Sequence, residues 1–469
     1  MASLAVLILA AGQGTRMKSD RIKVLHELSG RPMIDYVIET ASLITGSKPF
    51  IVVGYQADAV RQSTGNRAHF ILQEEQKGTG HAVMQAEPYL KGRFDEVVVL
   101  YGDCPLLSPK TVADLIDARR RAGAGCSVLT TEVDDPSGYG RVIRSPGSCD
   151  RVARIVEHKD ATREERAIRE INTGVYCFDT DVLFSALPQV SLRNVQGEFY
   201  ITDAVSVFAS QGISTVACKT PSPEEGLGIN DRRALADMAA IMRKRILDSL
   251  MLSGVTIEDP RTTYIDAGVT VGMDTIVRPN TFISGSTRIG RGCVIGPETI
   301  IEDSIIGDNV KVIVSVVEQS SVESDVSIGP FSHLRPGADI RGQAEIGNYV
   351  EIKNSVIGTG TKAHHHCYIG DATVGKGVNY SAGAITVNYD GKRKHRTVIE
   401  DGAFIGCNVN LIAPVTIGAG SFAAAGSTIT DEVPPDALAI ARERQTNKEG
   451  WALKRPKQFQ AGPDEQKNK

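Results

Sequence analysis

The sequence predicts two different folds in one chain: an α/β domain with a Rossmann-like, largely parallel sheet, followed by a β-helix of six-residue repeats. Three observations support this prediction. A chain of 469 residues exceeds one ordinary hydrophobic core. Short apolar runs alternate with amphipathic stretches as far as about residue 228. From about residue 251 an aliphatic residue recurs at every sixth position.

The first part of the chain shows the alternation of strands and helices that builds a parallel sheet. Short apolar runs of strand length are separated by amphipathic stretches, and the helical pattern is clearest over Pro109–Ala122. Strand–helix–strand units of this kind place helices on the faces of the sheet. The strands that we expect are Ala5–Leu9, Phe50–Val53, Val97–Leu100, Cys126–Thr131 and Gly174–Phe178.

A long helix separates the two predicted folds. Residues Asn230–Leu252 are rich in Ala, Met, Leu, Arg and Lys at helical spacing, and Gly254 follows their end. We therefore divide the chain into a first domain over residues 1–228, a linker helix over 229–250, a β-helix over 251–437 and a C-terminal arm over 438–469. The polar end of the arm, Lys454–Lys469, is expected to be disordered.

The six-residue period is typical of a hexapeptide β-helix. Each repeat forms one short strand and a tight corner, and three repeats make one triangular coil whose interior is filled by the aliphatic residue. An extended loop is expected at Asn388–Val398, which is polar, basic and out of phase. A β-sandwich with accidental spacing would not keep so many positions in phase: Val271, Val277, Ile283, Ile289, Ile295, Ile301, then Val322, Ile328, Leu334, Ile340, Ile346, Ile352, then Ile405, Leu411, Ile417, Ala423 and Ile429.

Composition excludes several classes of function. A net charge of −4 and a pI near 6.2 indicate no general attraction to nucleic acid or to anionic membranes. The eight cysteines are scattered singly, which favours reduced thiols in the cytoplasm over a disulfide framework. The apolar run Leu4–Ala11 lacks a basic start and leads into a Gly-rich loop, so we interpret it as a buried strand, and no apolar run is long enough to span a membrane.

A Gly-rich turn after the first strand predicts a phosphate site. Gly12 and Gly14 allow backbone N–H groups to approach an anion, and a helix start after them would add a favourable dipole. Lys23 lies nearby in sequence and could neutralise a phosphate. Asp103 follows a predicted strand at the edge where ligands of α/β sheets bind, and together with Asn230 it offers the oxygens that Mg²⁺ prefers. A GxG turn alone is weak, and neither the dinucleotide nor the P-loop pattern fits.

Further stretches give residues 1–250 a specific resemblance. LAAGQGTRM, KVLH, EEQKGTGHA, LYGDCPLL, GYGRV, IVEHKDAT, INTGVY, GEFYITD and GINDR occur in the order found in sugar-1-phosphate nucleotidyltransferases. Most closely they resemble the uridylyltransferase half of the bifunctional bacterial GlmU enzymes. One departure is Ile22, where the family usually has Pro.

The resemblance implies roles for named residues of the first domain. Asp103 and Asn230 would hold Mg²⁺, Lys23 would hold phosphates, and Glu157 would contact the sugar rather than solvent. The residues implied to bind UTP or UDP-N-acetylglucosamine are Leu9, Ala10, Ala11, Gly12, Lys23, Gln73, Gly78, Thr79, Tyr101, Gly102, Asp103, Gly140, Glu157, Asn172 and Asn230. Of these, Gly140, Glu157 and Asn172 would surround the acetylglucosamine together with Thr173, and Tyr200 and Thr202 would lie nearby.

Three consecutive histidines, His364–His366, mark a possible second site on the β-helix. Neighbours in a strand point to alternate sides, which suits a metal cage poorly, whereas a histidine beside polar residues can act as a general base near neutral pH. The stretches HLRPGA, GNYVEIKN, YIGDATVGKGVN, AGAITVNYDG, APVTIGAG and RQTNKEGW resemble the acetyltransferase half of the same family.

This second resemblance implies His365 as the general base for acetyl transfer. The sugar phosphate would be bound by Arg335, Lys353, Tyr368 and Asn379, and acetyl-CoA by Ala382, Asn388, Tyr389, Cys407, Ala425 and Arg442. Cys407 as a covalent nucleophile is a rival idea without a paired base. The departures from the family pattern are His364 for Gly, His366 for an apolar residue, Tyr380-Ser381 for Ile-Gly, and Cys407 for Ser.

Together the resemblances imply synthesis of UDP-N-acetylglucosamine for the bacterial cell wall from glucosamine 1-phosphate, acetyl-CoA and UTP, with Mg²⁺. The family's prism coils left-handed and packs as a homotrimer, so both features are implied here. One alternative keeps the nucleotidyltransferase but makes the β-helix an oligomerisation or regulatory platform. Another makes the whole chain a non-enzymatic assembly subunit. An inert platform is disfavoured because it needs none of Arg335, Lys353 and His365. A non-enzymatic subunit is disfavoured by the intact set Gly12, Lys23, Asp103 and Asn230.

Overall fold

The computed structural model describes residues 2–192, 194–220 and 222–454. Contact clustering divides the chain into two compact units. The first runs to Thr270 and also includes Phe282–Thr287, whereas the second consists of Val271–Thr281 and the chain from Arg288 onward. The predicted disordered end of the arm lies outside the described residues from residue 455 onward.

The first unit is built on a mixed sheet with the strand order β11-β7-β10-β6-β1-β4-β5. β10 is antiparallel to both neighbours and the other adjacent pairs are parallel, so the predicted largely parallel sheet is confirmed. β8 and β9 extend β10 as an antiparallel arm. The strands are β1 Leu4–Ala10, β2 Glu27–Leu28, β3 Arg31–Pro32, β4 Phe50–Val53, β5 His69–Leu72, β6 Glu96–Tyr101, β7 Cys126–Glu132, β8 Gly140–Arg144, β9 Val152–Val156, β10 Glu170–Asp179 and β11 Thr215–Lys219.

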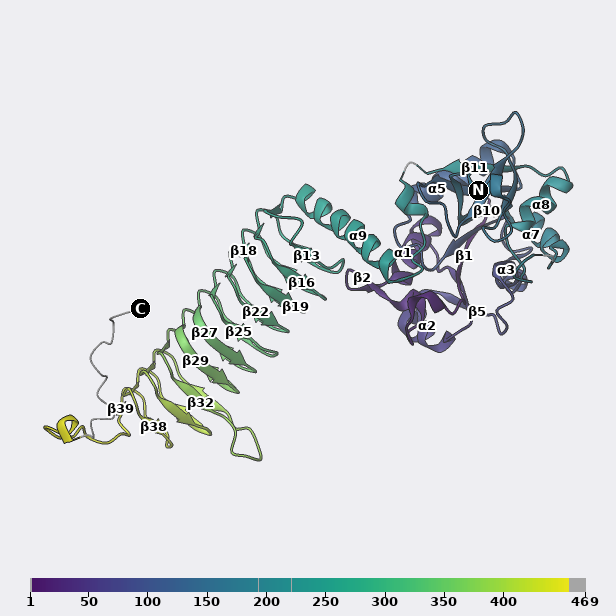
Figure 1. The fold of residues 1–469 in the computed structure, drawn as a ribbon. Helices are drawn as coiled ribbons and strands as arrows, with labels where there is room; N and C mark the ends of the chain where they lie inside the picture. Colours follow the sequence, from purple (N-terminus) through teal and green to yellow (C-terminus); the bar gives the residue numbers. More distant parts are fainter. Residues whose placement is uncertain (1, 193, 221, 455–469) are drawn as a thin grey trace. The chain divides into compact units, whose positions relative to one another are not determined.

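Helices cover both faces of this sheet (Figure 1). In β1, Leu7 and Leu9 belong to one hydrophobic cluster while Val6 and Ile8 belong to the other. Burial on both faces explains why this strand is an unbroken apolar run. The helices are α1 Met33–Thr45, α2 Ala57–Thr64, α3 Thr79–Met84, α4 Glu87–Leu90, α5 Pro109–Ala122, α6 Arg163–Arg166, α7 Thr180–Ala186, α8 Asp203–Ser210 and α9 Arg232–Leu252.

Helix α9 begins two residues later than the sequence pattern indicates. The Asp231 side chain accepts hydrogen bonds from the N–H groups of Arg233 and Ala234, at 3.0 and 2.9 Å. Asp231 is thus the N-cap, which leaves Asn230 outside the helix and free to take part in a site. The short strands that follow α9 are β12 Thr256–Ile257, β13 Tyr264–Ile265, β14 Thr270–Val271, β15 Ile276–Val277 and β16 Phe282–Ser284.

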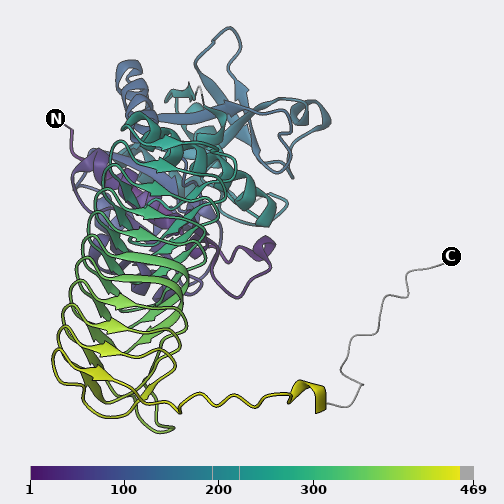
Figure 2. The ribbon, with the colours of Figure 1, turned by 90° about the vertical axis from the view of Figure 1, so that its left-hand side faces the viewer.

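The second unit is a prism of stacked coils, seen edge-on in Figure 1 and from another side in Figure 2. Strands one coil apart pair in parallel, as β17 does with β20 and β18 with β21. One ladder contains β17 Arg288–Ile289, β20 Ile305–Ile306, β23 Ser321–Val322, β26 Asp339–Ile340, β28 Val356–Ile357, β30 Ala372–Val374, β33 Thr397–Ile399 and β36 Val415–Ile417.

The remaining strands of the prism form a second, longer sheet. They are β18 Val294–Ile295, β19 Ile300–Glu302, β21 Lys311–Val312, β22 Val316–Glu318, β24 Ser327–Ile328, β25 His333–Leu334, β27 Glu345–Lys353, β29 Lys362–Gly370, β31 Asn379–Tyr380, β32 Ile385–Val387, β34 Phe404–Ile405, β35 Asn410–Ile412, β37 Phe422–Ala423, β38 Thr428–Ile429 and β39 Leu438–Ala439.

The aliphatic residues of the hexapeptide period fill the inside of the prism. Ile295, Ile352 and Ile417 are fully buried, and the other predicted inner positions are buried too, except Val271, which is half-buried at the start of the series. The hexapeptide β-helix is therefore confirmed. The predicted extended loop connects β32 to β33 and projects from the coils (Figure 1).

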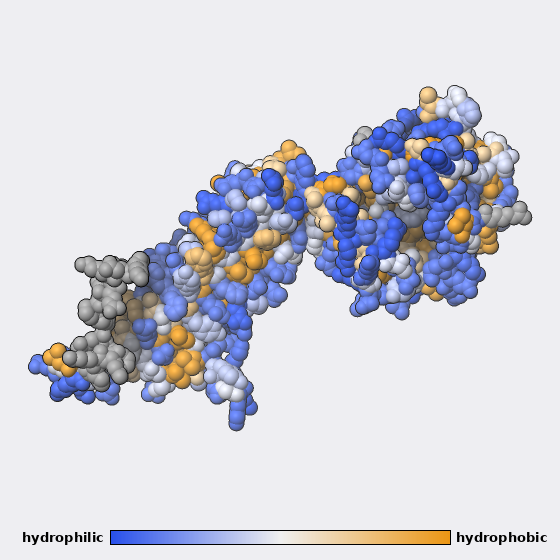
Figure 3. Space-filling view, viewed as in Figure 1, coloured by the Kyte–Doolittle hydropathy of each residue, from blue (hydrophilic) through white to orange (hydrophobic). Residues whose placement is uncertain are grey.

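The surface of the prism carries apolar as well as polar side chains (Figure 3). Phe331 stacks on Tyr349 with ring centroids 5.1 Å apart, and Phe404 stacks on Phe422 at 4.6 Å. Each pair joins neighbouring coils. Among the described residues, none of the helices combines the length and the apolar character needed to cross a membrane.

Candidate active sites in the two units

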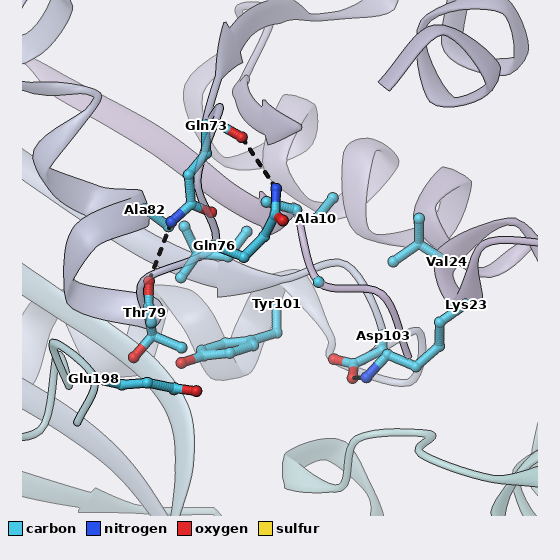
Figure 4. Close-up of a pocket in the computed structure, with 14 residues that line it drawn as sticks. Ala10, Lys23, Val24, Gln73, Gln76, Thr79, Ala82, Tyr101, Asp103 and Glu198 are labelled. Carbon is cyan, nitrogen blue, oxygen red and sulfur yellow. Dashed lines mark hydrogen bonds and ion pairs between the residues drawn. The ribbon is translucent and has the colours of Figure 1, made fainter. Parts of the chain in front are cut away.

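A pocket of about 280 Å³ opens where β1 and β6 end (Figure 4). Ten of the residues predicted to bind nucleotide line it: Leu9, Ala10, Ala11, Gly12, Lys23, Gln73, Gly78, Thr79, Tyr101 and Asp103. Gly102 lies in the same turn and donates its N–H to the Leu9 carbonyl at 3.0 Å. Parallel strands that end side by side bring these distant stretches together, as expected for ligand sites of α/β sheets.

Lys23 links the two residues predicted to hold a metal. Its ammonium forms an ion pair with the buried Asp103 and donates to the Asn230 side-chain oxygen at 3.1 Å. Arg16 donates to the same oxygen at 2.8 Å. Since one cation already contacts both oxygens, the carboxylate of Asp103 and the amide oxygen of Asn230 fit a shared divalent cation such as Mg²⁺.

The Gly-rich loop differs from expectation in one respect. Gly14 has φ +67° and a Cβ there would lie 2.6 Å from the Lys23 Cβ, so this turn requires glycine. The expected helix after it is only a three-residue 3₁₀ helix, Thr15–Met17. The predicted helix dipole is therefore weak at this point, and charge on an anion would be met mainly by Lys23 and Arg16.

The predicted sugar-binding residues meet beside this pocket. Gly140 pairs with Asn172 across β8 and β10, and a Cβ on Gly140 would lie 3.6 Å from both the Asn172 Cβ and the Glu157 Oε1. Glu157 accepts a hydrogen bond from the Thr202 hydroxyl at 3.1 Å. Burial raises the pKa of Glu157, against the opposing effect of that hydrogen bond. Glu157 is therefore a half-buried, hydrogen-bonded acid.

A bulge in β10 positions Asn172 and Tyr101. The register shifts between Asn172 and Tyr176, and the Asn172 side chain accepts the N–H of Gly174 at 3.0 Å. Gly174 has φ +85°, and a Cβ there would lie 2.7 Å from the Tyr101 ring, so glycine makes room for this pocket wall. Thr173 turns away and donates to the Leu129 carbonyl at 2.9 Å, and the buried Tyr200 hydroxyl has no partner among the described residues.

In the second unit, cations gather on one side of the prism. Arg335 and Lys353 follow the paired residues Leu334 and Ile352, so they lie on neighbouring coils. Lys394, from the projecting loop, lowers the pKa of Lys353 by its proximity, and Arg335 adds to the effect. Arg335 itself donates to Glu351 at 2.7 Å. Although carboxylates lie beside Arg335 and Lys394, the convergence of three cations favours a phosphate.

Polar side chains surround this cluster. Asn388 donates to Asp371 at 2.5 Å and lies 3.4 Å from the Tyr368 hydroxyl. Lys394 is 3.9 Å from the same Asp371 carboxylate. Asn379 donates to the Ser381 hydroxyl at 2.9 Å, and Tyr389 starts the projecting loop. Asp371 thus connects the loop to the face that carries Arg335 and Lys353.

His365 lies at a corner of the prism. It is paired with Asn348 of the preceding coil and is exposed, and its ring meets that of His364 edge-on at 5.9 Å. The expectation that neighbouring histidines point to alternate sides is wrong here. The chain turns at His366, which has φ +36°, so His365 and His366 both face solvent. The described residues contain no group of three potential metal ligands.

Four of the six residues predicted to bind acetyl-CoA, Ala382, Cys407, Ala425 and Arg442, form a column along the prism. The N–H of Asn408 donates to the Ala382 carbonyl and that of Gly426 to the Cys407 carbonyl, both at 2.8 Å. A Cβ on Gly426 would lie 3.8 Å from the Arg442 side chain. Ala382, Cys407, Ala425 and Arg442 therefore follow one another coil by coil.

Comparison with known proteins places both units in one family. A family model for the MobA-like NTP transferase domain matches residues 6–173. A bifunctional protein GlmU from Halalkalibacterium halodurans is 51% identical over 97% of this chain and 100% of its own length. Proteins of the same name from Geobacillus sp. (strain WCH70) and Geobacillus thermodenitrificans are each 51% identical, over 95% of this chain and 96% of their own length. The chain belongs to the bifunctional GlmU family. Its prism is accordingly the left-handed β-helix of hexapeptide repeats expected from the resemblance.

Several residues of this GlmU-family chain were missed by reasoning from sequence. In the pocket they are Val24, Gln76, Ala82 and Glu198, and on the prism they are Glu351, Asp371 and Lys394. All seven lie inside stretches already marked from the sequence, for example Glu198 in GEFYITD, Asp371 in YIGDATVGKGVN and Lys394 in the basic loop, but none was singled out. Their contacts depend on the coil register or on the close approach of strands, which sequence spacing does not reveal.

Proposed function

We propose that this chain makes UDP-N-acetylglucosamine in two steps, one in each unit. The amine of glucosamine 1-phosphate first attacks the thioester of acetyl-CoA on the prism. The product, N-acetylglucosamine 1-phosphate, then attacks the α-phosphate of UTP in the first unit and releases pyrophosphate. The class of enzyme is that of a bifunctional transferase acting on small molecules.

The acetyl step needs a base, an anion site and room for a long thioester. His365 removes a proton from the amine of glucosamine 1-phosphate while the amine nitrogen forms a bond to the acetyl carbon. The carbon–sulfur bond of the thioester breaks and CoA leaves as its thiolate. Arg335, Lys353 and Lys394 hold the sugar phosphate, with Tyr368 and Asn379 beside the sugar. The column from Ala382 to Arg442 receives CoA, flanked by Asn388 and Tyr389.

The uridylyl step needs charge neutralisation rather than a covalent nucleophile. Both substrates are anions, and the work of the protein is to align them and offset their repulsion. Lys23, Arg16 and backbone N–H groups of the Gly-rich loop contact phosphates, while Glu157 and Asn172 position the sugar. Asp103 and Asn230 would hold Mg²⁺, which supplies electrostatic stabilisation of the transferring phosphate when bound.

One observation separates this function from a nucleotidyltransferase with an inert prism. Arg335, Lys353 and Lys394 come from separate coils and a loop yet converge, close enough that Lys394 and Arg335 both lower the pKa of Lys353. Repulsion among these three cations would only destabilise an inert scaffold, whereas a bound phosphate would offset it.

We further propose a homotrimer that works in the cytoplasm. Exposed aromatic side chains on the prism, including Phe331, Tyr349 and Phe422, offer apolar surface that a second copy of the chain could cover. The scattered single cysteines agree with a reducing compartment.

The experiment follows thiol release from acetyl-CoA with glucosamine 1-phosphate, and pyrophosphate release from UTP, on the same preparation. His365→Ala should abolish thiol release and leave pyrophosphate release intact, whereas the neighbouring His366→Ala serves as the matched control. Thiol release that is absent, or equal in His365→Ala and wild type, refutes the acetyltransferase assignment.

The metal assignment is tested by pyrophosphate release across a Mg²⁺ titration. Asp103→Ala should abolish it, and Asp58→Ala, an exposed carboxylate on α2, should not. Activity of Asp103→Ala at saturating Mg²⁺ would remove Asp103 from the metal site.

A further inference from the structure

Arg141 is an arginine buried in the first unit without a carboxylate partner. Only 1% of its surface is exposed, and none of the carboxylates in the described residues lies within ion-pair distance. Burial lowers the pKa of its guanidinium against the opposing effect of the Asp135 charge, which lies beyond ion-pair distance, yet an arginine stays charged in proteins. By contrast, Arg144 on the same strand pairs with Glu170 at 2.5 Å. Keeping an unpaired cation buried is costly, so its contacts need an explanation.

The guanidinium joins two segments that are far apart in sequence. One terminal nitrogen donates to the Tyr139 carbonyl, and the other lies 3.3 Å from the Nδ1 of His158. Because a guanidinium can only donate, Nδ1 of His158 must accept and the ring proton belongs on Nε2. The remaining nitrogen, Nε, is buried with no partner among the described residues.

Each of these segments leads directly into the sugar-binding region. Tyr139 precedes Gly140, and His158 follows Glu157. A Cβ on Gly140 would lie 3.6 Å from the Glu157 carboxylate, so these two walls face each other closely. Arg141 contacts Tyr139 and His158, the residues next to Gly140 and Glu157. A contact to both segments restrains the distance between Gly140 and Glu157.

We propose that Arg141 is a positioning residue that sets the sugar-phosphate site of the first unit by bracing Tyr139–Gly140 against His158–Glu157. This inference rests on the proposed uridylyl transfer. An apolar residue of similar size would fill the same space, but it would leave the Tyr139 carbonyl without its donor. It would also remove the contact that joins Tyr139–Gly140 to Glu157–His158.

The test measures KM for N-acetylglucosamine 1-phosphate, KM for UTP and kcat by pyrophosphate release. The variants are Arg141→Met, Arg141→Lys, His158→Ala and His158→Asn, with Arg154→Met as control, since Arg154 is half-exposed on the adjacent strand and pairs with Glu165 on the surface. Asparagine places an acceptor oxygen where Nδ1 of histidine lies, and alanine does not. Circular dichroism of the full chain, which contains the helices of the first unit, matched to wild type reports that each variant is folded, and thiol release reports on the second unit.

We expect Arg141→Met to lower kcat/KM for the sugar phosphate about 10-fold or more, chiefly through KM, with the KM for UTP within about 2-fold of wild type. Arg141→Lys, which can satisfy only one of the two acceptors, should have a kcat/KM for the sugar phosphate between those of wild type and Arg141→Met. His158→Asn should resemble wild type and His158→Ala should not, and the double variant Arg141→Met/His158→Ala should be no worse than Arg141→Met alone.

Equal changes in both KM values, or identical behaviour of His158→Asn and His158→Ala, would overturn the inference while leaving the proposed function standing. If Arg141→Met does not fold, Arg141→Lys and the two His158 variants carry the same comparison. A wild-type protein that releases no pyrophosphate overturns the proposed uridylyl transfer, and this inference with it.

Discussion

Replacing Gly174 by alanine should destabilise the first unit and distort its nucleotide pocket. Gly174 has φ +85° and its added Cβ would lie 2.7 Å from the Tyr101 ring, a distance that requires movement. Tyr101 is held in place by the strand β6 and lines the pocket. The substitution therefore carries two penalties, one from the backbone and one from the ring.

Gly147 separates these two penalties. Its φ is +75° and a Cβ there would meet nothing within 4 Å, so Gly147→Ala has the backbone penalty alone. That penalty is about 1–2 kcal/mol. The ring clash adds about 1–3 kcal/mol in Gly174→Ala. We thus expect Gly174→Ala to lose about 2–5 kcal/mol of the free energy of unfolding, and Gly147→Ala about 1–2 kcal/mol.

The assay is urea unfolding of the full chain, followed by loss of pyrophosphate release for the first unit and by circular dichroism for the whole chain. The KM for UTP at low urea is measured for both variants. Gly174→Ala should raise this KM because Tyr101 moves, and Gly147→Ala should not. Equal losses of stability in the two variants, or an unchanged KM in Gly174→Ala, would refute the reasoning.

Three further perturbations test the charges and the prism. Burial raises the pKa of Asp203 to about 6, so its protonated form is favoured in the fold, and this contribution is complete below its ordinary pKa and lost as the pH rises through 6. Asp203→Asn should therefore stabilise the protein. The gain in the free energy of unfolding, measured by urea unfolding, should be larger at pH 8 than at pH 5 by about 1 kcal/mol, and a larger gain at pH 5 would contradict this sign. Glu96 is 1% exposed and pairs with Arg119 and Arg120, and both arginines hold its pKa low against burial. Glu96→Gln should cost about 3–5 kcal/mol in urea unfolding because it leaves Arg119 buried and unpaired, whereas Glu39→Gln in an exposed pair should cost less than about 1 kcal/mol; similar losses would show that burial of the pair is irrelevant. Cys407 is exposed in the proposed CoA column, and Cys407→Ser restores a stronger hydrogen-bonding group, so the KM for acetyl-CoA in the thiol-release assay should fall by about 2- to 10-fold. A rise in that KM would remove Cys407 from the cofactor site.

The sequence was most informative where one physical rule governs many residues. The six-residue period identifies the inner face of the prism because each aliphatic residue has only the interior to fill, and Ile295 and Ile352 illustrate this with full burial. The apolar run at Leu4–Ala10 predicts a strand for the same reason, since both of its faces are covered.

Sites built from register or from close approach were less predictable. The sequence spacing of Glu351 and Arg335 does not predict their contact, because the contact depends on the offset between neighbouring coils. The histidines at 364–366 were expected to alternate, but a corner at His366 overrides strand geometry. Arg141 was inside a recognised stretch, yet its burial and its two acceptors come from the folding of β8 against β9.

In the proposed acetyl-CoA site, the spacing of Ala382, Cys407, Ala425 and Arg442 along the prism is set by the stacking of the coils. Each coil adds about 4.8 Å along the axis, so the reach of the column changes only in whole steps of that size. A ligand shorter or longer by less than one step keeps the same rungs and must adjust by bending. A whole coil gained or lost would instead move the Arg442 end of the column by a full step while leaving the proposed base His365 in place.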